Sequence, residues 1–285
     1  MLIAFVCMAA PARGQDQVRS LRTESPELIG VGQVRAGFAV EFLHRARYSL
    51  SGLEGDLLRL GVIDVSVGVG DYAEFRLSGV CRDFLTVSRR SPAVIPATFM
   101  GDTTSDFGDL ILGAKMKLAT EKGVRPAFAF SFAAELPNAT NESGLGADET
   151  QFFARLALSK HLGRAQLVGN LGLAILGSAV QPNSQADLLT YGFEAIVPLH
   201  KKFELVGEVY GRQGPPRVGN ESLAQVQMGA RFLAAGLRWD VAGMAGLRHF
   251  NPSTGLSVGV TYEFQAFHKK PGPVTIRPEK PPKIE

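Results

Sequence analysis

Long apolar runs and pairs of cysteines are both missing from this chain of 285 residues. No stretch of about 18 apolar residues occurs, so the sequence offers no transmembrane helix. Cysteine appears only at Cys7 and Cys81, and Cys7 lies in a segment that we expect to be removed. The mature chain would then hold one cysteine, which excludes an internal disulfide.

Charge of one sign and catalytic motifs are also scarce. The chain has 30 basic and 27 acidic residues and no block of five like charges, so nucleic-acid binding is not expected. It contains no Gly-x-Ser-x-Gly, paired-cysteine or His-Glu-x-x-His motif. Its histidines fall at predicted strand ends, in turns or in the tail: His44, His161, His200, His249 and His268. We therefore expect no enzyme, no cofactor and no metal site.

The N-terminal residues have the features of an export signal. Residues 2–10 are apolar, and small residues follow at Ala12 and Gly14, which predicts a signal peptide over residues 1–14 with cleavage before Gln15. The usual basic start is missing, and a buried N-terminal strand or helix is the alternative. Residues 15–30 are then predicted to form an N-terminal periplasmic segment.

Apolar side chains alternate with polar or small ones through most of the chain. In residues 34–42, Val34, Phe38 and Phe42 belong to one face, and Arg35 and Glu41 belong to the other. This period of two is typical of β-strands, and high glycine content with many β-branched residues agrees with it. The pattern recurs, with three weaker examples, and predicts twelve strands within residues 31–264. They lie near 34–42, 57–68, 72–82, 110–118, 128–136, 152–158, 167–175, 191–197, 202–212, 226–232, 237–241 and 256–264.

The predicted connections alternate in length. Short ones are expected near 69–71, 119–125, 160–163, 198–201 and 234–235. Longer ones are expected near 44–56, 83–107, 137–148, 176–186, 213–222 and 247–255. Short turns at one end and long loops at the other are typical of outer-membrane barrels.

The charged side chains decide which face is wet. The polar faces carry both signs of charge, whereas the apolar faces carry almost none, and a charge facing lipid costs about 2–4 kcal/mol. This favours a closed antiparallel transmembrane β-barrel of the bacterial outer-membrane type over a soluble barrel such as a lipocalin. The residues predicted to line the lumen are Arg76, Lys115, Glu135, Arg155, Glu194 and Arg231.

Two polar regions have more than one interpretation. Residues 265–285 are rich in proline and lysine, so they predict an extended periplasmic tail that contacts the cell wall or a periplasmic partner; an ordinary solvated C-terminus is the alternative. Asp102, Asp106 and Asp109 cluster at the end of the longest predicted loop. Their oxygens suit calcium, but their spacing does not match an EF-hand, which favours a solvated loop.

Three segments carry a family resemblance: DFGDLILGAKMKLA, FAFSFAAELPNAT and FFARLALSKHLGRAQLVGNLGLA, all within residues 106–174. They resemble an outer-membrane transporter family named for the MetA pathway of phenol degradation. Gly108, Asp109, Lys115 and the Leu136-Pro137 pair match the family pattern, whereas Asn138-Ala139 departs from the usual Thr-Gly. The resemblance implies uptake of small, hydrophobic or aromatic compounds, and it identifies no substrate-binding residue.

These observations predict a channel or transporter for small solutes in the outer membrane. Eight-stranded barrels pack shut and sixteen-stranded ones leave an aqueous channel, so twelve strands suit a narrow passage. The expected partners are outer-membrane lipid and a small-molecule solute. A structural or adhesion barrel with a plugged lumen is the alternative, and a soluble periplasmic β-protein is a third interpretation.

Overall fold

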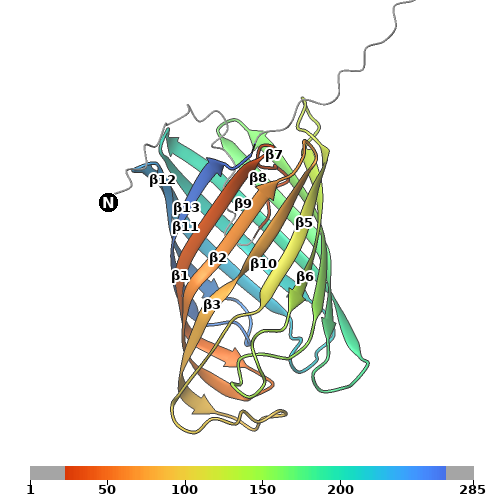
Figure 1. Ribbon diagram of the computed structural model, residues 1–285, viewed down its shortest axis with the longest axis vertical. Coiled ribbons are helices and arrows are strands. Elements are labelled where there is room, and N and C mark those ends of the chain that lie inside the picture. The colour runs from red at the N-terminus through yellow and green to blue at the C-terminus, as the bar shows by residue number, and fades with distance from the viewer. Residues whose placement is uncertain (1–22, 268–285) are drawn as a thin grey trace, which may run out of the picture.

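The computed structural model describes residues 23–267, which form one closed antiparallel barrel (Figure 1). Each wall strand pairs with its neighbour in the chain, and β13 pairs with β1 to close the wall, which confirms the predicted fold. The wall strands are β1 (Gln33–Tyr48), β2 (Leu53–Gly68), β3 (Ala73–Arg90), β5 (Leu110–Ala119), β6 (Ala127–Leu136), β7 (Gln151–Leu162), β8 (Ala165–Gly177), β9 (Gln185–His200), β10 (Phe203–Gln213), β11 (Leu223–Ala234), β12 (Leu237–Gly246) and β13 (Thr254–Gln265).

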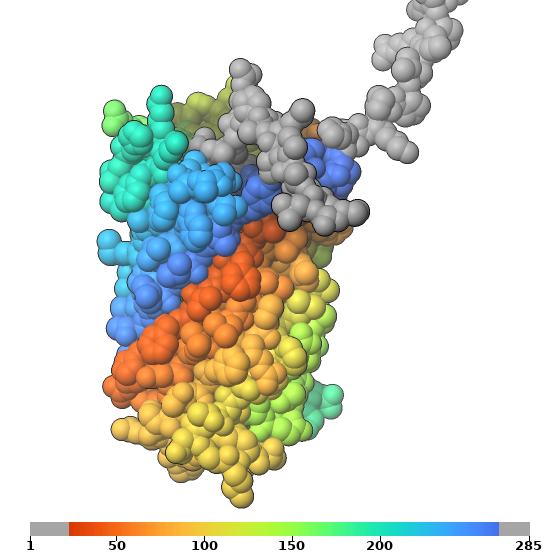
Figure 2. Space-filling model, turned by 60° about the vertical axis from the view of Figure 1, so that its left-hand side comes forward, coloured from red at the N-terminus to blue at the C-terminus, as the bar shows by residue number. Residues whose placement is uncertain are grey.

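The closing seam is visible where the first and last strands meet. The strands cross the outer wall obliquely, and red-orange β1 lies beside blue β13 in Figure 2. Within residues 23–267, no helix is long and apolar enough to cross a membrane. The predicted signal peptide and nearly all of the predicted tail lie outside the described residues.

Apolar side chains point away from the barrel axis, as the charge argument predicts. Phe38, Phe42 and Phe132 are each about half exposed on the outer wall, whereas Arg35 and Glu41 are buried inside. The chain lies in the bacterial outer membrane, where lipid covers this apolar surface.

The two ends of the barrel differ. The turn end carries the connections 69–72, 120–126, 163–164, 201–202 and 235–236, together with the start of β1 and the end of β13. The loop end carries the connections 49–52, 91–109, 137–150, 178–184, 214–222 and 247–253. All six predicted long connections lie at the loop end, and five of them are long in the structure.

The prediction of a long first loop over residues 44–56 is wrong. β1 continues to Tyr48 and β2 begins at Leu53, so the connection is a short turn over residues 49–52. A bulge at Arg45 (φ 55°) adds one residue to β1. β1 stays paired with β2 across the bulge, although the alternation of its side chains is interrupted there. Leu43 and Ala46 are both buried inside, so the period of two is lost where the strand continues.

The predicted loop over residues 83–107 is also too long. β3 extends to Arg90, and a short additional strand, β4 (Thr103–Asp106), pairs with it. The inward phase again changes within the strand, because Glu74 is buried in the first half and Asp83 in the second. Gly61 on β2 has a positive φ of 69° and lies beside Cys81 on β3, so both strands are irregular at this point. Alternation in the sequence is lost there, and the second half of β3 was therefore predicted as loop.

Candidate functional site: the barrel lumen

Residues 23–30 lie inside the turn end of the barrel and contact inward side chains of distant strands. The Thr23 amide donates to Glu208 on β10 (3.0 Å), and the Ile29 amide donates to Glu74 on β3 (2.9 Å). Thr23, Leu28 and Ile29 are buried there. The end of the predicted segment over residues 15–30 therefore occupies part of the lumen, a placement that the sequence analysis did not foresee.

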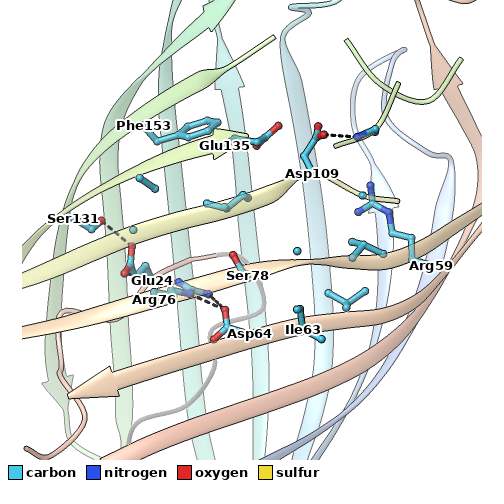
Figure 3. A pocket seen from close by; sticks show the side chains of 18 of the residues that line it. Glu24, Arg59, Ile63, Asp64, Arg76, Ser78, Asp109, Ser131, Glu135 and Phe153 are labelled. Atoms are coloured by element: carbon cyan, nitrogen blue, oxygen red, sulfur yellow. Dashed lines mark hydrogen bonds and ion pairs between the residues drawn. The ribbon is translucent and has the colours of Figure 1, made fainter. Parts of the chain in front are cut away.

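Glu24 is the centre of these contacts (Figure 3). Its carboxylate accepts a hydrogen bond from the Ser131 hydroxyl at 2.9 Å and from Arg155 Nη1 at 3.4 Å. Lys115 Nζ and Arg76 Nη1 each lie 3.8 Å from the other carboxylate oxygen. One buried anion thus joins three cationic side chains that come from β3, β5 and β7.

The charges around Glu24 determine its ionisation. Burial raises the pKa of this carboxyl, but the charges of Lys115, Arg76 and Arg155 and the Ser131 hydrogen bond together lower it further. The pKa therefore lies below its ordinary value, and Glu24 is ionised at neutral pH.

Hydrogen bonds between side chains of the barrel wall and the backbone also hold residues 23–30 in place. The Glu24 amide donates to Asn170 Oδ1 at 2.6 Å, and Asn170 Nδ2 donates back to the Glu24 carbonyl at 2.7 Å. Lys115 Nζ donates to the Ser25 carbonyl at 3.0 Å. These bonds satisfy backbone groups of an irregular segment inside the barrel, as a buried chain requires.

A cavity of about 420 Å³ lies next to this segment, on the side of the lumen formed by β1–β3 and β5–β7. Ten charged residues line it, with both signs present: Glu24, Glu41, Arg59, Asp64, Arg76, Asp83, Asp109, Lys115, Glu135 and Arg155. Several are paired along the wall. Arg76 Nε donates to Asp64 at 2.7 Å, and Lys115 lies 2.8 Å from Glu74. We refer to this half of the barrel as the cavity wall.

Apolar side chains gather inside the barrel at the loop end of β1–β3. Inward residues of β1, β2 and β3 form a buried cluster of Leu43, Ala46, Leu53, Leu57 and Leu85. Ala97 and Phe99 from one loop and Leu145 from another pack on this apolar cluster. The two loops are joined by a hydrogen bond from the Thr98 amide to the Glu142 carbonyl at 3.0 Å. Loop residues therefore rest on apolar side chains inside the loop end, on the side formed by β1–β3.

The opposite half of the barrel, formed by β9–β13 and called the packed wall below, contains tightly buried ion pairs. Arg231 Nη2 on β11 lies 3.1 Å from Glu194 Oε1 on β9, and the two side chains are 3% and 0% exposed. Arg35 on β1 is paired with Glu263 on β13 at the adjacent seam. Gln227 is also buried on the inner side of β11.

The six predicted lumen residues divide between these two walls. Arg76, Lys115, Glu135 and Arg155 line the cavity, whereas Glu194 and Arg231 pair with each other in the packed wall. Sequence reasoning missed Glu24 and Asn170, because residues 23–30 have no periodic pattern that relates them to the barrel. It also could not explain Phe153, which departs from alternation and points inward toward the buried side chains of β8 and β9.

Asp106 and Asp109 of the long loop bind backbone amides of the chain that follows β6. The Asp109 carboxylate accepts from the Asn138 and Ala139 amides, each at 2.9 Å, and Asp106 accepts from the Thr140 amide at 2.8 Å. Within residues 23–267, no group of three or more His, Cys, Asp or Glu side chains is arranged to hold a metal ion.

Comparison with solved structures gives barrels of the same kind. The COG4313 outer membrane channel from Pseudomonas putida F1 has a TM-score of 0.57 and 16% identity, over 84% of this chain and 98% of that one. The translocator domain of the autotransporter NalP from Neisseria meningitidis has a TM-score of 0.47 and 13% identity, over 83% and 90%. At these identities the likeness concerns the fold. No curated protein sequence matches the chain.

A family model gives the relationship at the level of sequence. The model described as "Putative MetA-pathway of phenol degradation" matches residues 55–264, which is most of the barrel. This range contains the three segments that carried the resemblance, and it extends across strands that share only their alternation with them. The chain is thus a member of this family and an outer-membrane β-barrel.

Proposed function

We propose that this barrel is a channel for small solutes, which pass through the lumen along the cavity wall. The observation that carries the proposal is the cavity of about 420 Å³, lined by charged groups of both signs, inside a barrel whose outer surface is apolar. A barrel that served only as an anchor would need no cavity there. The similar protein from Pseudomonas putida F1 is described as an outer membrane channel, which supports the same function.

The direction of the barrel follows from its connections. Short turns of outer-membrane barrels face the periplasm and longer loops face outward. The turn end, with residues 23–30 inside it, is then the periplasmic exit, and the apolar cluster lies at the external mouth. A solute enters past apolar side chains, which suits small compounds with an apolar or aromatic body, and the axial exit then leads past the charged contacts of Glu24.

The structural barrel with a plugged lumen is a second candidate, and one observation favours it. Glu24 is held by Ser131 and three cations, and its backbone is bonded twice to Asn170. If these contacts never open, residues 23–30 act as a permanent plug.

Single-channel conductance in planar bilayers separates the two candidates. The wild-type barrel should show discrete conductance steps, and Glu24→Ala should increase the step size or the open fraction, because the segment loses its central contact. Asp187→Ala is the matched control, since this exposed carboxylate on β9 lies away from the segment and should leave the conductance unchanged. Wild-type protein that inserts as a heat-modifiable barrel yet never conducts would contradict the channel and leave the structural barrel.

A further inference from the structure

Two of the cations that surround Glu24 are held in place by the barrel wall itself. Arg76 Nε donates to Asp64 at 2.7 Å, whereas Arg76 Nη1 lies 3.8 Å from Glu24. Lys115 Nζ likewise lies 2.8 Å from Glu74 and 3.8 Å from Glu24. Because their shorter contacts are with wall carboxylates, both cations would keep their positions if the Glu24 side chain moved away.

The charges of this group leave one positive charge for a carboxylate. The wall contributes Arg76, Lys115 and Arg155, and the first two each pair with a carboxylate of the wall. The remaining charge is neutralised by Glu24, which lies 3.4 Å from Arg155 Nη1. The Ser131 hydroxyl adds a donor at 2.9 Å. One cation in excess, with donors pointing to the same place, suits a single carboxylate group.

The segment that carries Glu24 is joined to the barrel by separate hydrogen bonds. None of the strands described within residues 23–267 pairs with residues 23–30. The segment is held instead by bonds such as those between Glu24 and Asn170 and between the Ile29 amide and Glu74. A segment held in this way opens more readily than a strand with two complete ladders. The Glu24 side chain can therefore be displaced while the barrel wall stays closed.

Inward positions of β5, β6 and β7 form two rows beside the cavity. The charged row consists of Lys115, Ser131 and Arg155, which are neighbours in strand register. The small row lies one inward position closer to the loop end and consists of Gly113, Ala133 and Phe153. All six residues line the cavity, so the site of the Glu24 carboxylate is continuous with the space over the small row.

The small row offers room for a flat ring. Gly113 has no side chain and Ala133 has one methyl group, so the space in front of them is left open up to the ring of Phe153. That ring packs on the buried side chains Leu176 and Leu188, which hold it in position. Figure 3 shows Phe153 on the same side of the cavity as Ser131. A second ring placed over the small row would meet Phe153 in the offset or edge-to-face contact that aromatic pairs prefer.

We propose that the two rows form a binding site for a small aromatic acid in its carboxylate form. The carboxylate of the solute takes the place of Glu24 at Ser131 and Arg155, and its ring lies over the small row against Phe153. Glu24 occupies the site when no such solute is bound. The inference deepens the proposed function by naming a substrate class, and it rests on that function for the route by which the solute arrives.

Calorimetric titration of the purified barrel with sodium benzoate tests the site. Glu24→Ala should bind benzoate about tenfold or more tightly than the wild type, because an attached carboxylate competes at a high effective concentration. Benzamide has the same ring without the charge, and acetate has the charge without the ring. Each should bind Glu24→Ala about tenfold or more weakly than benzoate does. Equal affinities for benzoate and benzamide, or no benzoate binding by folded Glu24→Ala, would overturn the proposal.

A wall variant tests where the carboxylate binds. In the Glu24→Ala background, Arg155→Gln should weaken benzoate binding by about tenfold or more, because the carboxylate loses a charged donor. Arg59→Gln is the matched control, since this arginine lines the same cavity but pairs with Glu41 at 3.6 Å and Asp83 at 3.5 Å. It should leave the affinity nearly unchanged. Equal losses in the two variants would contradict the assigned position of the carboxylate.

A second pair of variants tests the position of the ring and keeps the charged row intact. Ala133→Leu fills the space over the small row and should weaken benzoate binding to the Glu24→Ala barrel by about tenfold or more, because the ring loses its place. Ala134→Leu, on the outward face of the same strand, should have no effect. Heat-modifiable migration shows which variants fold, and an unchanged affinity in folded Ala133→Leu would overturn the proposal.

The same measurements separate this site from the channel. Benzoate binding by a barrel that never conducts would reject the channel and leave the site. Conductance of a barrel whose Glu24→Ala variant binds no benzoate would reject the site and leave the channel.

Discussion

The cavity wall and the packed wall of this barrel share one sequence pattern, but their inward side chains are packed differently. In both, polar or small side chains alternate with apolar ones along the strands. On the cavity wall, Arg76 and Arg155 remain about one-third exposed and reach a carboxylate from residues 23–30. On the packed wall, Glu194 on β9 and Arg231 on β11 pair across the intervening strand β10 and lose nearly all contact with solvent. A polar inner face is therefore equally able to line a passage or to fill one.

The largest expected difference concerns stability. Arg231→Ala should lower the free energy of unfolding by about 3–5 kcal/mol, because it leaves the buried Glu194 carboxylate without its cation. Arg155→Ala should cost only about 1 kcal/mol or less, since its side chain is partly exposed and Glu24 keeps its other partners. Urea unfolding in lipid vesicles, followed by the fluorescence of the single tryptophan, Trp239, measures both. Equal losses would mean that the two walls are packed alike.

Ion selectivity should change more in Arg155→Ala than in Arg231→Ala, the reverse of the order expected for stability. Arg155→Ala makes the cavity more negative and should raise the ratio of potassium to chloride permeability by about two- to fivefold, the equivalent of up to about 1 kcal/mol. Arg231→Ala should leave this ratio unchanged in the molecules that fold. Reversal potentials under a salt gradient measure the ratio. A larger shift for Arg231→Ala would place the passage along β9–β12 instead.

The smallest expected effect is a pH dependence at the turn end. The pKa of Glu24 is lowered in the folded barrel, so its contribution to holding residues 23–30 is fully present above its ordinary pKa of 4.5 and is lost as the pH falls through the lowered value. Conductance should therefore rise as the pH falls from 4.5 through this lowered pKa, because protonation weakens the contacts with the three cations.

Other carboxyls face the same cavity, including Asp64, Asp83, Asp109 and Glu135, so the comparison must be made with Glu24→Gln. This variant should already have the higher conductance at neutral pH and should show a smaller change on acidification. An identical pH profile in wild type and Glu24→Gln would show that Glu24 does not control the segment.

Alternation was enough to predict the barrel and the wet face, because lipid excludes charge from one side of every strand. It was not enough to place strand ends where a bulge changes the phase, as at Arg45 on β1 and near Cys81 on β3. Glu24 could not be predicted either, since its role depends on strands far away in sequence. The division of Arg155 and Arg231 between a cavity and a buried pair depends on neighbouring strands, which a local pattern does not contain.

The central claim is that solutes pass along the cavity wall, and cysteine modification during conductance recording tests it most directly. Ser78 lines the cavity on β3, and Gln227 is buried on the inner side of β11. In a Cys81→Ser background, a charged methanethiosulfonate reagent should reduce the current through Ser78→Cys and leave the current through Gln227→Cys unchanged. Block at Gln227→Cys with no effect at Ser78→Cys would contradict this account.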